Sequence, residues 1–122
     1  MISGNTLLKD ISPSNDLTRE LLLQLSEQFS LYHYGVTNMF LHQTQIRSNN
    51  INDSSESDCY FIVYASAHRF YYETNFGYEV DSSVIDEYTT VDELTNMIGE
   101  FVLQQKKYQM NNDLNIIKED FK

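Results

Sequence analysis

The chain has 122 residues, the length of one ordinary domain, and 41% of them are hydrophobic. This composition argues against a wholly disordered chain, and no apolar run approaches the ~18 residues that a membrane span needs. The net charge of −10 disfavours direct binding to nucleic acid or to an anionic membrane, because like charges repel. Net charge also maintains solubility, so by itself it does not identify a partner.

We expect one α+β domain over residues 1–122, located in the cytoplasm. The start of the chain lacks the basic and apolar regions of a secretory signal. The single cysteine, Cys59, can form neither an internal disulfide nor, alone, a cysteine-based zinc site, which favours a reducing compartment.

The first 13 residues are predicted to form a leading arm, docked through Leu7, Leu8 and Ile11. Good N-cap residues at Ser14, Asn15 and Asp16 predict the start of a first helix, and Gly35 is placed to end it. The apolar face of this helix repeats at helical spacing through Leu17, Leu21, Leu22, Leu25, Phe29 and Tyr32.

Strands are predicted next. Val36–Arg47 is interpreted as one strand, and the polar run Ser48–Asp58 as a mobile loop. Cys59–Ser66 and Phe70–Phe76 follow as two further strands, separated by a turn that contains His68. Successive side chains of a strand point to opposite faces of the sheet. In the first of these strands, one face therefore carries Cys59, Phe61, Val63 and Ala65, and the other carries Tyr60, Ile62, Tyr64 and Ser66. A short edge strand is expected within Tyr78–Tyr88.

A second helix is predicted to begin with a capping box, in which Thr90 is the cap and Glu93 reaches back. Its buried stripe consists of Leu94, Ile98, Phe101 and Val102, flanked by Val91 and Met97. Lys106 and Lys107 are assigned to its last turn, and the run 111–113 to the start of a short third helix. The order α-β-β-β-α-α predicts an α+β fold, a three- to four-stranded antiparallel sheet with helices packed on one face.

No catalytic or metal site is expected, and no cofactor. His33, His42 and His68 lack the spacing of metal ligands, and His33 is assigned to the C-terminal end of the first helix. Cys59 opens an apolar strand, where a thiol behaves as a small hydrophobic group. The paired carboxylates Asp86-Glu87 and Asp92-Glu93 are interpreted as solvated charges, so we expect that the protein is not an enzyme.

Tyrosine and acidic residues carry the functional prediction. No lysine or arginine occurs between Arg69 and Lys106, a stretch with eight acidic residues and interleaved tyrosines. A contiguous acidic surface there would accelerate association with a basic protein. The predicted partner-binding residues are Tyr78, Glu79, Asp81, Asp86, Glu87, Tyr88, Asp92 and Glu93. The tyrosines of the strands also fit an ordinary aromatic sheet face, so they are weaker indicators.

The hypothesis is an acidic module that inhibits a basic, nucleic-acid-handling protein, as an immunity protein neutralises a nuclease toxin. A phage-type inhibitor that mimics nucleic acid fits the same residues. A small acidic secretion chaperone and a small enzyme are further alternatives. The sequence specifies neither the partner nor the oligomeric state.

Overall fold

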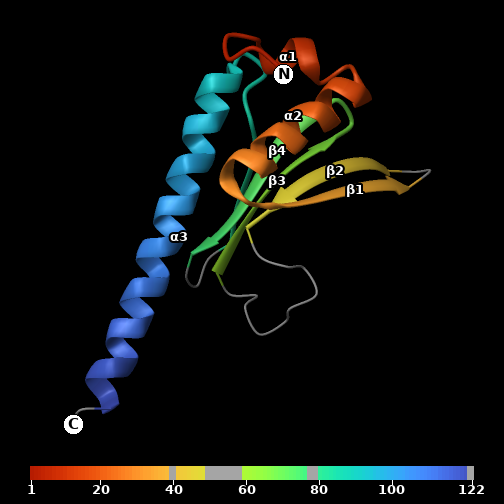
Figure 1. Cartoon of the computed structure of the whole chain (residues 1–122). Coiled ribbons are helices and arrows are strands. Elements are labelled where there is room, and N and C mark those ends of the chain that lie inside the picture. Colours follow the sequence, from red (N-terminus) through yellow and green to blue (C-terminus); the bar gives the residue numbers. More distant parts are fainter. Residues whose placement is uncertain (39–40, 49–58, 77–79, 121–122) are drawn as a thin grey trace.

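The computed structural model describes residues 1–38, 41–48, 59–76 and 80–120, of which 34–38, 41–44, 109 and 111–120 are described by their backbone alone. Five antiparallel strands form a sheet in which each strand pairs with the next along the chain (Figure 1). N-terminal and C-terminal helices pack against it, so the α+β class is confirmed. In chain order the elements are α1 (Leu8–Ile11), α2 (Asn15–Phe29), β1 (Tyr32–Asn38), β2 (Leu41–Arg47), β3 (Cys59–Ser66), β4 (Arg69–Phe76), β5 (Val80–Val84) and α3 (Val91–Asp120).

Alternation along β3 determines which face of the sheet the helices cover. Phe61 and Val63 are fully buried, whereas the alternate residues Tyr60, Ile62 and Tyr64 remain partly exposed. The ring of Phe61 lies 5.6 Å from that of Phe101 in α3, and the buried leucines of α2 join the same core. Both helices therefore pack on one face, as the sequence predicts, and the opposite face carries Tyr60, Ile62 and Tyr64.

Helix α2 begins as predicted but ends earlier. Ser14 caps it by accepting a hydrogen bond from the Leu17 backbone nitrogen over 3.3 Å. The helix stops at Phe29 because Ser30 adopts the left-handed conformation, with φ of 55°. Gly35, the predicted terminator, instead pairs with Thr44 within the sheet, so His33 lies on a strand and not at the end of a helix.

The prediction of one strand over Val36–Arg47 is wrong, because this segment contributes to both β1 and β2. β1 and β2 form a hairpin whose connection, residues 39–40, lies outside the described residues. The sequence there is Met39-Phe40, which lacks the glycine, proline or asparagine that normally indicates a turn. The sheet consequently has five strands where three or four were predicted. Residues 49–58 of the predicted loop also lie outside the described part.

Helix α3 starts with the predicted capping box. The Glu93 backbone nitrogen donates to the Thr90 hydroxyl, and that hydroxyl donates to the Glu93 carboxylate, each over 3.2 Å. The prediction of two separate C-terminal helices is wrong, since one helix continues to Asp120 (Figure 1). Asparagine and aspartate lower helix propensity only modestly, so the run 111–113 does not interrupt it. Lys106 and Lys107 therefore lie in mid-helix.

The N-terminal arm is paired with the connection between β5 and α3. The Leu8 and Lys9 nitrogens donate to the Thr89 and Glu87 carbonyl oxygens, and two further bonds link Val91 to Thr6 and Asp92 to Gly4. Leu8 and Ile11 are buried, as the sequence predicts, although they belong to the short helix α1. This pairing holds the N-terminal arm against the start of α3 at one end of the sheet, while the C-terminal end of α3 lies far from it (Figure 1). No helix among the described residues has the length and hydropathy to cross a membrane.

Candidate functional site

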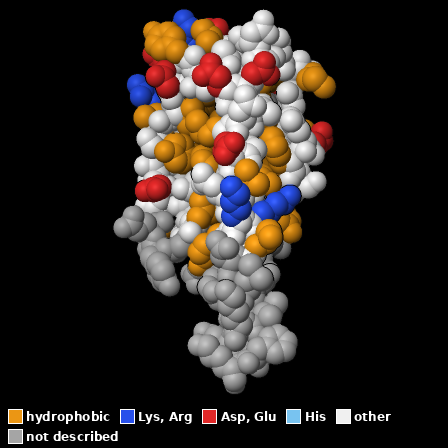
Figure 2. Space-filling model, turned by 90° about the vertical axis from the view of Figure 1, so that its left-hand side faces the viewer, with side chains coloured by type: hydrophobic (Ala, Val, Ile, Leu, Met, Phe, Trp, Pro, Cys, Tyr) orange, Lys and Arg blue, Asp and Glu red, His pale blue; other side chains and the backbone are white. Residues whose placement is uncertain are grey.

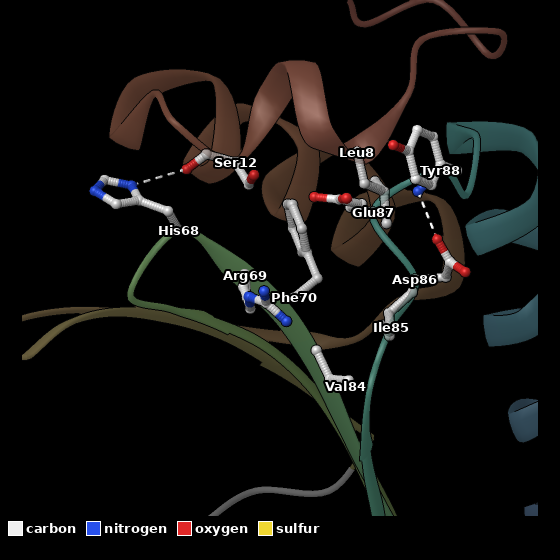
Figure 3. Close-up of a pocket in the computed structure, with 10 residues that line it drawn as sticks. All are labelled: Leu8, Ser12, His68, Arg69, Phe70, Val84, Ile85, Asp86, Glu87 and Tyr88. Carbon is white, nitrogen blue, oxygen red and sulfur yellow. Dashed lines mark hydrogen bonds between the residues drawn. The ribbon is translucent and has the colours of Figure 1, made fainter.

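A pocket of about 300 Å³ lies where the N-terminal arm, the β3–β4 turn and the β5–α3 connection meet (Figure 3). Its buried apolar lining comes from Leu8, Phe70 and Ile85. The remaining lining residues are polar or more exposed, and they are Ser12, His68, Arg69, Val84, Asp86, Glu87 and Tyr88. Asp86, Glu87 and Tyr88 belong to the predicted partner-binding set. The pocket thus combines an apolar base with a charged rim.

The β3–β4 turn forms one wall of the pocket. Its two central residues, Ala67 and His68, both have positive φ, 50° and 63°. Two-residue hairpin turns that suit the strand twist require positive φ at both positions, which usually selects Asn-Gly. Here the turn directs the His68 ring toward α1, where Nδ1 lies 3.2 Å from the Ser12 carbonyl oxygen (Figure 3). That bond requires the proton on Nδ1, and it ties the turn to the N-terminal arm.

The opposite wall is a tight turn that presents two acidic side chains and a tyrosine. The Asp86 carboxylate accepts a hydrogen bond from the Tyr88 nitrogen over 2.8 Å, and the Asp86 carbonyl oxygen accepts one from Thr89. Asp86 therefore turns back on the chain, whereas Glu87 extends toward the arm (Figure 3). Tyr88 is 63% exposed, a large value for an aromatic side chain.

Asp92 and Glu93 lie in the first turn of α3, where negative charge also complements the helix dipole. Both side chains are exposed. The Asp92 carboxylate packs closely beside Gly4, so a side chain at that position would require the carboxylate to shift. The pairing of the arm with residues 87–92 places this helix start at the same end of the molecule as the pocket. Figure 2 shows a row of acidic side chains near the end where α3 begins, with basic side chains beside this end and farther down the same face.

Among the predicted residues that the structure describes, Asp81, Asp92 and Glu93 do not line the pocket. Asp81 lies on β5, five residues before Asp86, which places it roughly 16 Å away along an extended strand. Tyr78 and Glu79 lie outside the described residues. The structure therefore brings together Asp86, Glu87 and Tyr88 at the pocket and holds Asp92 and Glu93 at the same end.

Basic residues that are distant in sequence border this end of the molecule. Arg69 lines the pocket, and the Lys9 ammonium lies 5.3 Å from the centroid of the Tyr88 ring. The stretch between Arg69 and Lys106 contains no lysine or arginine, but the fold places basic side chains from outside the stretch beside it. Within the described residues, however, the ion pair found is that of the N-terminal amine with Glu20, at 3.4 Å. The carboxylates of Asp86, Glu87, Asp92 and Glu93 have no cation within 4.0 Å there.

Sequence reasoning missed Ser12, His68, Arg69 and Lys9 as neighbours of the acidic residues. His68 and Arg69 were assigned only to a turn, and Lys9 only to the arm. The available signal was the strand order, because a hairpin turn and the end of a neighbouring edge strand meet at the same end of a sheet. That signal required the fifth strand to be recognised first.

The uncovered face of the sheet carries the predicted tyrosines. Tyr64 and Tyr71 stack with ring centroids 5.2 Å apart, and the Arg47 guanidinium lies 4.5 Å from the Tyr60 ring centroid. The Tyr60 hydroxyl donates to Glu73 over 2.7 Å. Burial raises the pKa of Tyr60, and the hydrogen bond to Glu73 raises it further. These side chains satisfy one another across strands, as in an ordinary aromatic sheet face.

The cysteine is buried at the start of β3, and burial raises the pKa of its thiol. Its carbonyl oxygen accepts a hydrogen bond from Gln105 over 3.0 Å, which links β3 to α3. Among the described residues, no three His, Cys, Asp or Glu side chains are grouped so as to hold a metal ion.

No protein-family model, no curated protein and no solved structure is significantly similar to this chain. The site must therefore be interpreted from its own geometry.

Proposed function

We propose that the protein is an acidic binding module that inhibits a basic, nucleic-acid-handling protein, in the manner of an immunity protein that neutralises a nuclease toxin. The observation that carries the proposal is the gathering, at one end of the molecule, of exposed carboxylates that have no ion-pair partner among the described residues. They belong to Asp86, Glu87, Asp92 and Glu93. Nucleic-acid-binding grooves are lined with lysine and arginine, and so complement such a surface.

Electrostatics supports this choice of partner. A net charge of −10 on 122 residues repels nucleic acid and attracts basic proteins from a distance. Carboxylates that are exposed and unpaired in the free protein can pair with a partner without first breaking an internal ion pair. Complementary charge of this kind mainly raises the association rate and selects against acidic partners.

The pocket and Tyr88 supply the short-range contacts. An aliphatic stem of lysine or arginine can lie on the apolar base formed by Leu8, Phe70 and Ile85 while its charged head meets the Glu87 carboxylate. The exposed Tyr88 ring beside the pocket offers a rigid contact area of the kind enriched in protein interfaces. Binding at this end would cover the partner's basic groove and so inhibit it.

The experiment starts with the partner itself, captured from cells of the source organism by the tagged protein. Its nuclease activity and its affinity are then measured with the wild type and with the double variant Asp86→Asn/Glu87→Gln. The variant removes two charges but retains the side-chain oxygen that accepts from Tyr88. We expect affinity to fall on the order of tenfold, with a matching loss of inhibition.

The matched control is Glu27→Gln/Glu100→Gln, which removes the same charge from exposed positions on α2 and α3. It should retain nearly full affinity. An acidic or neutral captured protein, or equal losses from both double variants, would contradict the proposal.

A further inference from the structure

We propose that β5 is a self-pairing edge, through which two copies of the chain form a continuous antiparallel sheet. β5 is the last strand in the sheet order, so one side of it has no strand neighbour among the described residues. All five of its residues are exposed, including Val80 at 56% and Val84 at 44%. This inference does not rest on the proposed function.

The hydrogen-bonding phase of β5 shows which backbone groups face the open side. The Ile85 nitrogen donates to the Phe70 carbonyl oxygen over 2.8 Å, so residues 70 and 85 are a directly hydrogen-bonded pair. Such pairs alternate along an antiparallel ladder, and the register pairs Tyr72 with Ser83 and Thr74 with Asp81. The N–H and C=O groups of Val80, Ser82 and Val84 therefore point away from β4, toward the open side.

One register of β5 against a second β5 uses all of these groups. Centred on Ser82, it places Ser82 opposite Ser82 of the second copy and each Val80 opposite the other copy's Val84. These are three directly opposed pairs, and each exchanges two hydrogen bonds. Sliding by two residues in either direction leaves only two such pairs, so the centred register is the best satisfied.

Side chains favour the same register. Val80 and Val84 lie opposite Asn75 and Tyr71, on the uncovered face of the sheet, so the centred register packs exposed valines against each other. Asp81 then faces Ser83 of the second copy, whereas one of the shifted registers places Asp81 directly opposite Asp81. β5 carries no lysine or proline, the residues with which natural edge strands commonly resist pairing.

The helices leave room for this arrangement. α3 lies over β3 and β4, where Phe101 contacts Phe61 and Tyr72. In a joined sheet the two α3 helices would be separated by about four strand spacings, roughly 19 Å. Packed helices approach to about 8–10 Å, so the two copies do not collide there.

The first test compares Ser82→Pro with Ser82→Ala by sedimentation equilibrium of the purified chain, from micromolar to millimolar concentration. The wild type should show a reversible monomer–dimer equilibrium that higher salt strengthens, since both copies are acidic. Proline removes an outward N–H but no bond to β4, so Ser82→Pro should be a folded monomer by circular dichroism. Ser82→Ala retains the N–H and should dimerise like the wild type.

A second pair of variants keeps every backbone donor and tests the register. Ser83→Lys places a cation opposite Asp81 of the second copy and should tighten the dimer on the order of tenfold. Ser83→Asp places an anion there and should weaken it by a similar factor. A wild-type chain that is monomeric at every concentration, or Ser83→Lys and Ser83→Asp variants that shift the equilibrium in the same direction, would overturn the inference. Dimerisation that Ser82→Pro leaves intact would assign the contact to another surface and overturn it as well.

Discussion

At the scale of single residues, His33 is the clearest example of a side chain whose environment the sequence did not reveal. On β1 it pairs with the buried Ile46, so it faces the helix-covered side of the sheet. Its Nε2 is buried and has no hydrogen-bond partner in the described part of the chain. Burial, followed by the nearby charge of Arg19, lowers the pKa of His33 from its usual 6.5. A protonated ring is therefore unfavourable in the folded state.

This lowered pKa makes stability depend on pH in one direction. Between the folded-state pKa and 6.5, the unfolded chain binds the His33 proton more readily than the folded chain does. The contribution to stability is complete above pH 6.5 and is lost as the pH falls toward the folded-state pKa. Urea unfolding of His33→Gln should accordingly show a smaller loss of stability between pH 7 and pH 5 than the wild type, a range that spans the usual histidine pKa.

The exposed His68 supplies the control for that experiment, since His68→Gln removes an imidazole from the surface. The comparison of the two variants separates an effect of the buried His33 ring from the loss of one imidazole from the chain. If the free energy of unfolding of His33→Gln depended on pH as that of the wild type does, His33 would not be a cause of the loss of stability at low pH.

At the scale of elements, the sequence predicted best where alternation or capping was strong. The bounds of β3 were predicted correctly because an unbroken run of apolar and aromatic residues begins at Cys59, but the sequence left open which of its two faces is buried. The start of α3 was predicted from Thr90 and Glu93. The β1–β2 hairpin was missed because its connection has no turn residues. The end of α2 was misplaced because Ser30, and not a glycine, takes the left-handed conformation.

Only the part of the candidate site that is local in sequence could be predicted. Acidic residues 86–93 are local in sequence, so their grouping at one end could be predicted from charge alone. The opposite wall of the pocket comes from Ser12 and His68, which are 56 residues apart and joined by a hydrogen bond. Contacts of that kind depend on sheet order, which periodicity does not report.

The capping box makes a prediction at this scale. Thr90→Ala removes the hydroxyl that accepts from the Glu93 nitrogen and should lower the free energy of unfolding by about 0.5–2 kcal/mol. Thr90→Ser retains the hydroxyl and should recover most of that loss in the same urea titration. Equal losses in both variants would assign the effect to the missing methyl group and not to the cap.

At the scale of the whole molecule, the open edge of β5 runs up to the charged end, and Val84 belongs to both because it also lines the pocket. The pairing of residues 4–9 with 87–92 fixes the helix start and the pocket at one end. The outward backbone groups of β5 lie along the side of the sheet. Higher salt should weaken binding to a basic partner, because it screens the attraction between unlike net charges. It should strengthen pairing with a second copy, because it screens the repulsion between like net charges.

Recognition of a basic partner by the acidic end is tested most directly by the association rate constant with the captured partner, measured from about 50 mM to about 500 mM salt. Association should slow at least on the order of tenfold across this range while dissociation changes little. The charge reversal Asp86→Lys/Glu87→Lys should slow association at low salt and flatten its salt dependence, whereas Glu27→Lys/Glu100→Lys should do neither. An association rate that is insensitive to salt, or that both double reversals alter equally, would contradict recognition of a basic partner by this acidic end.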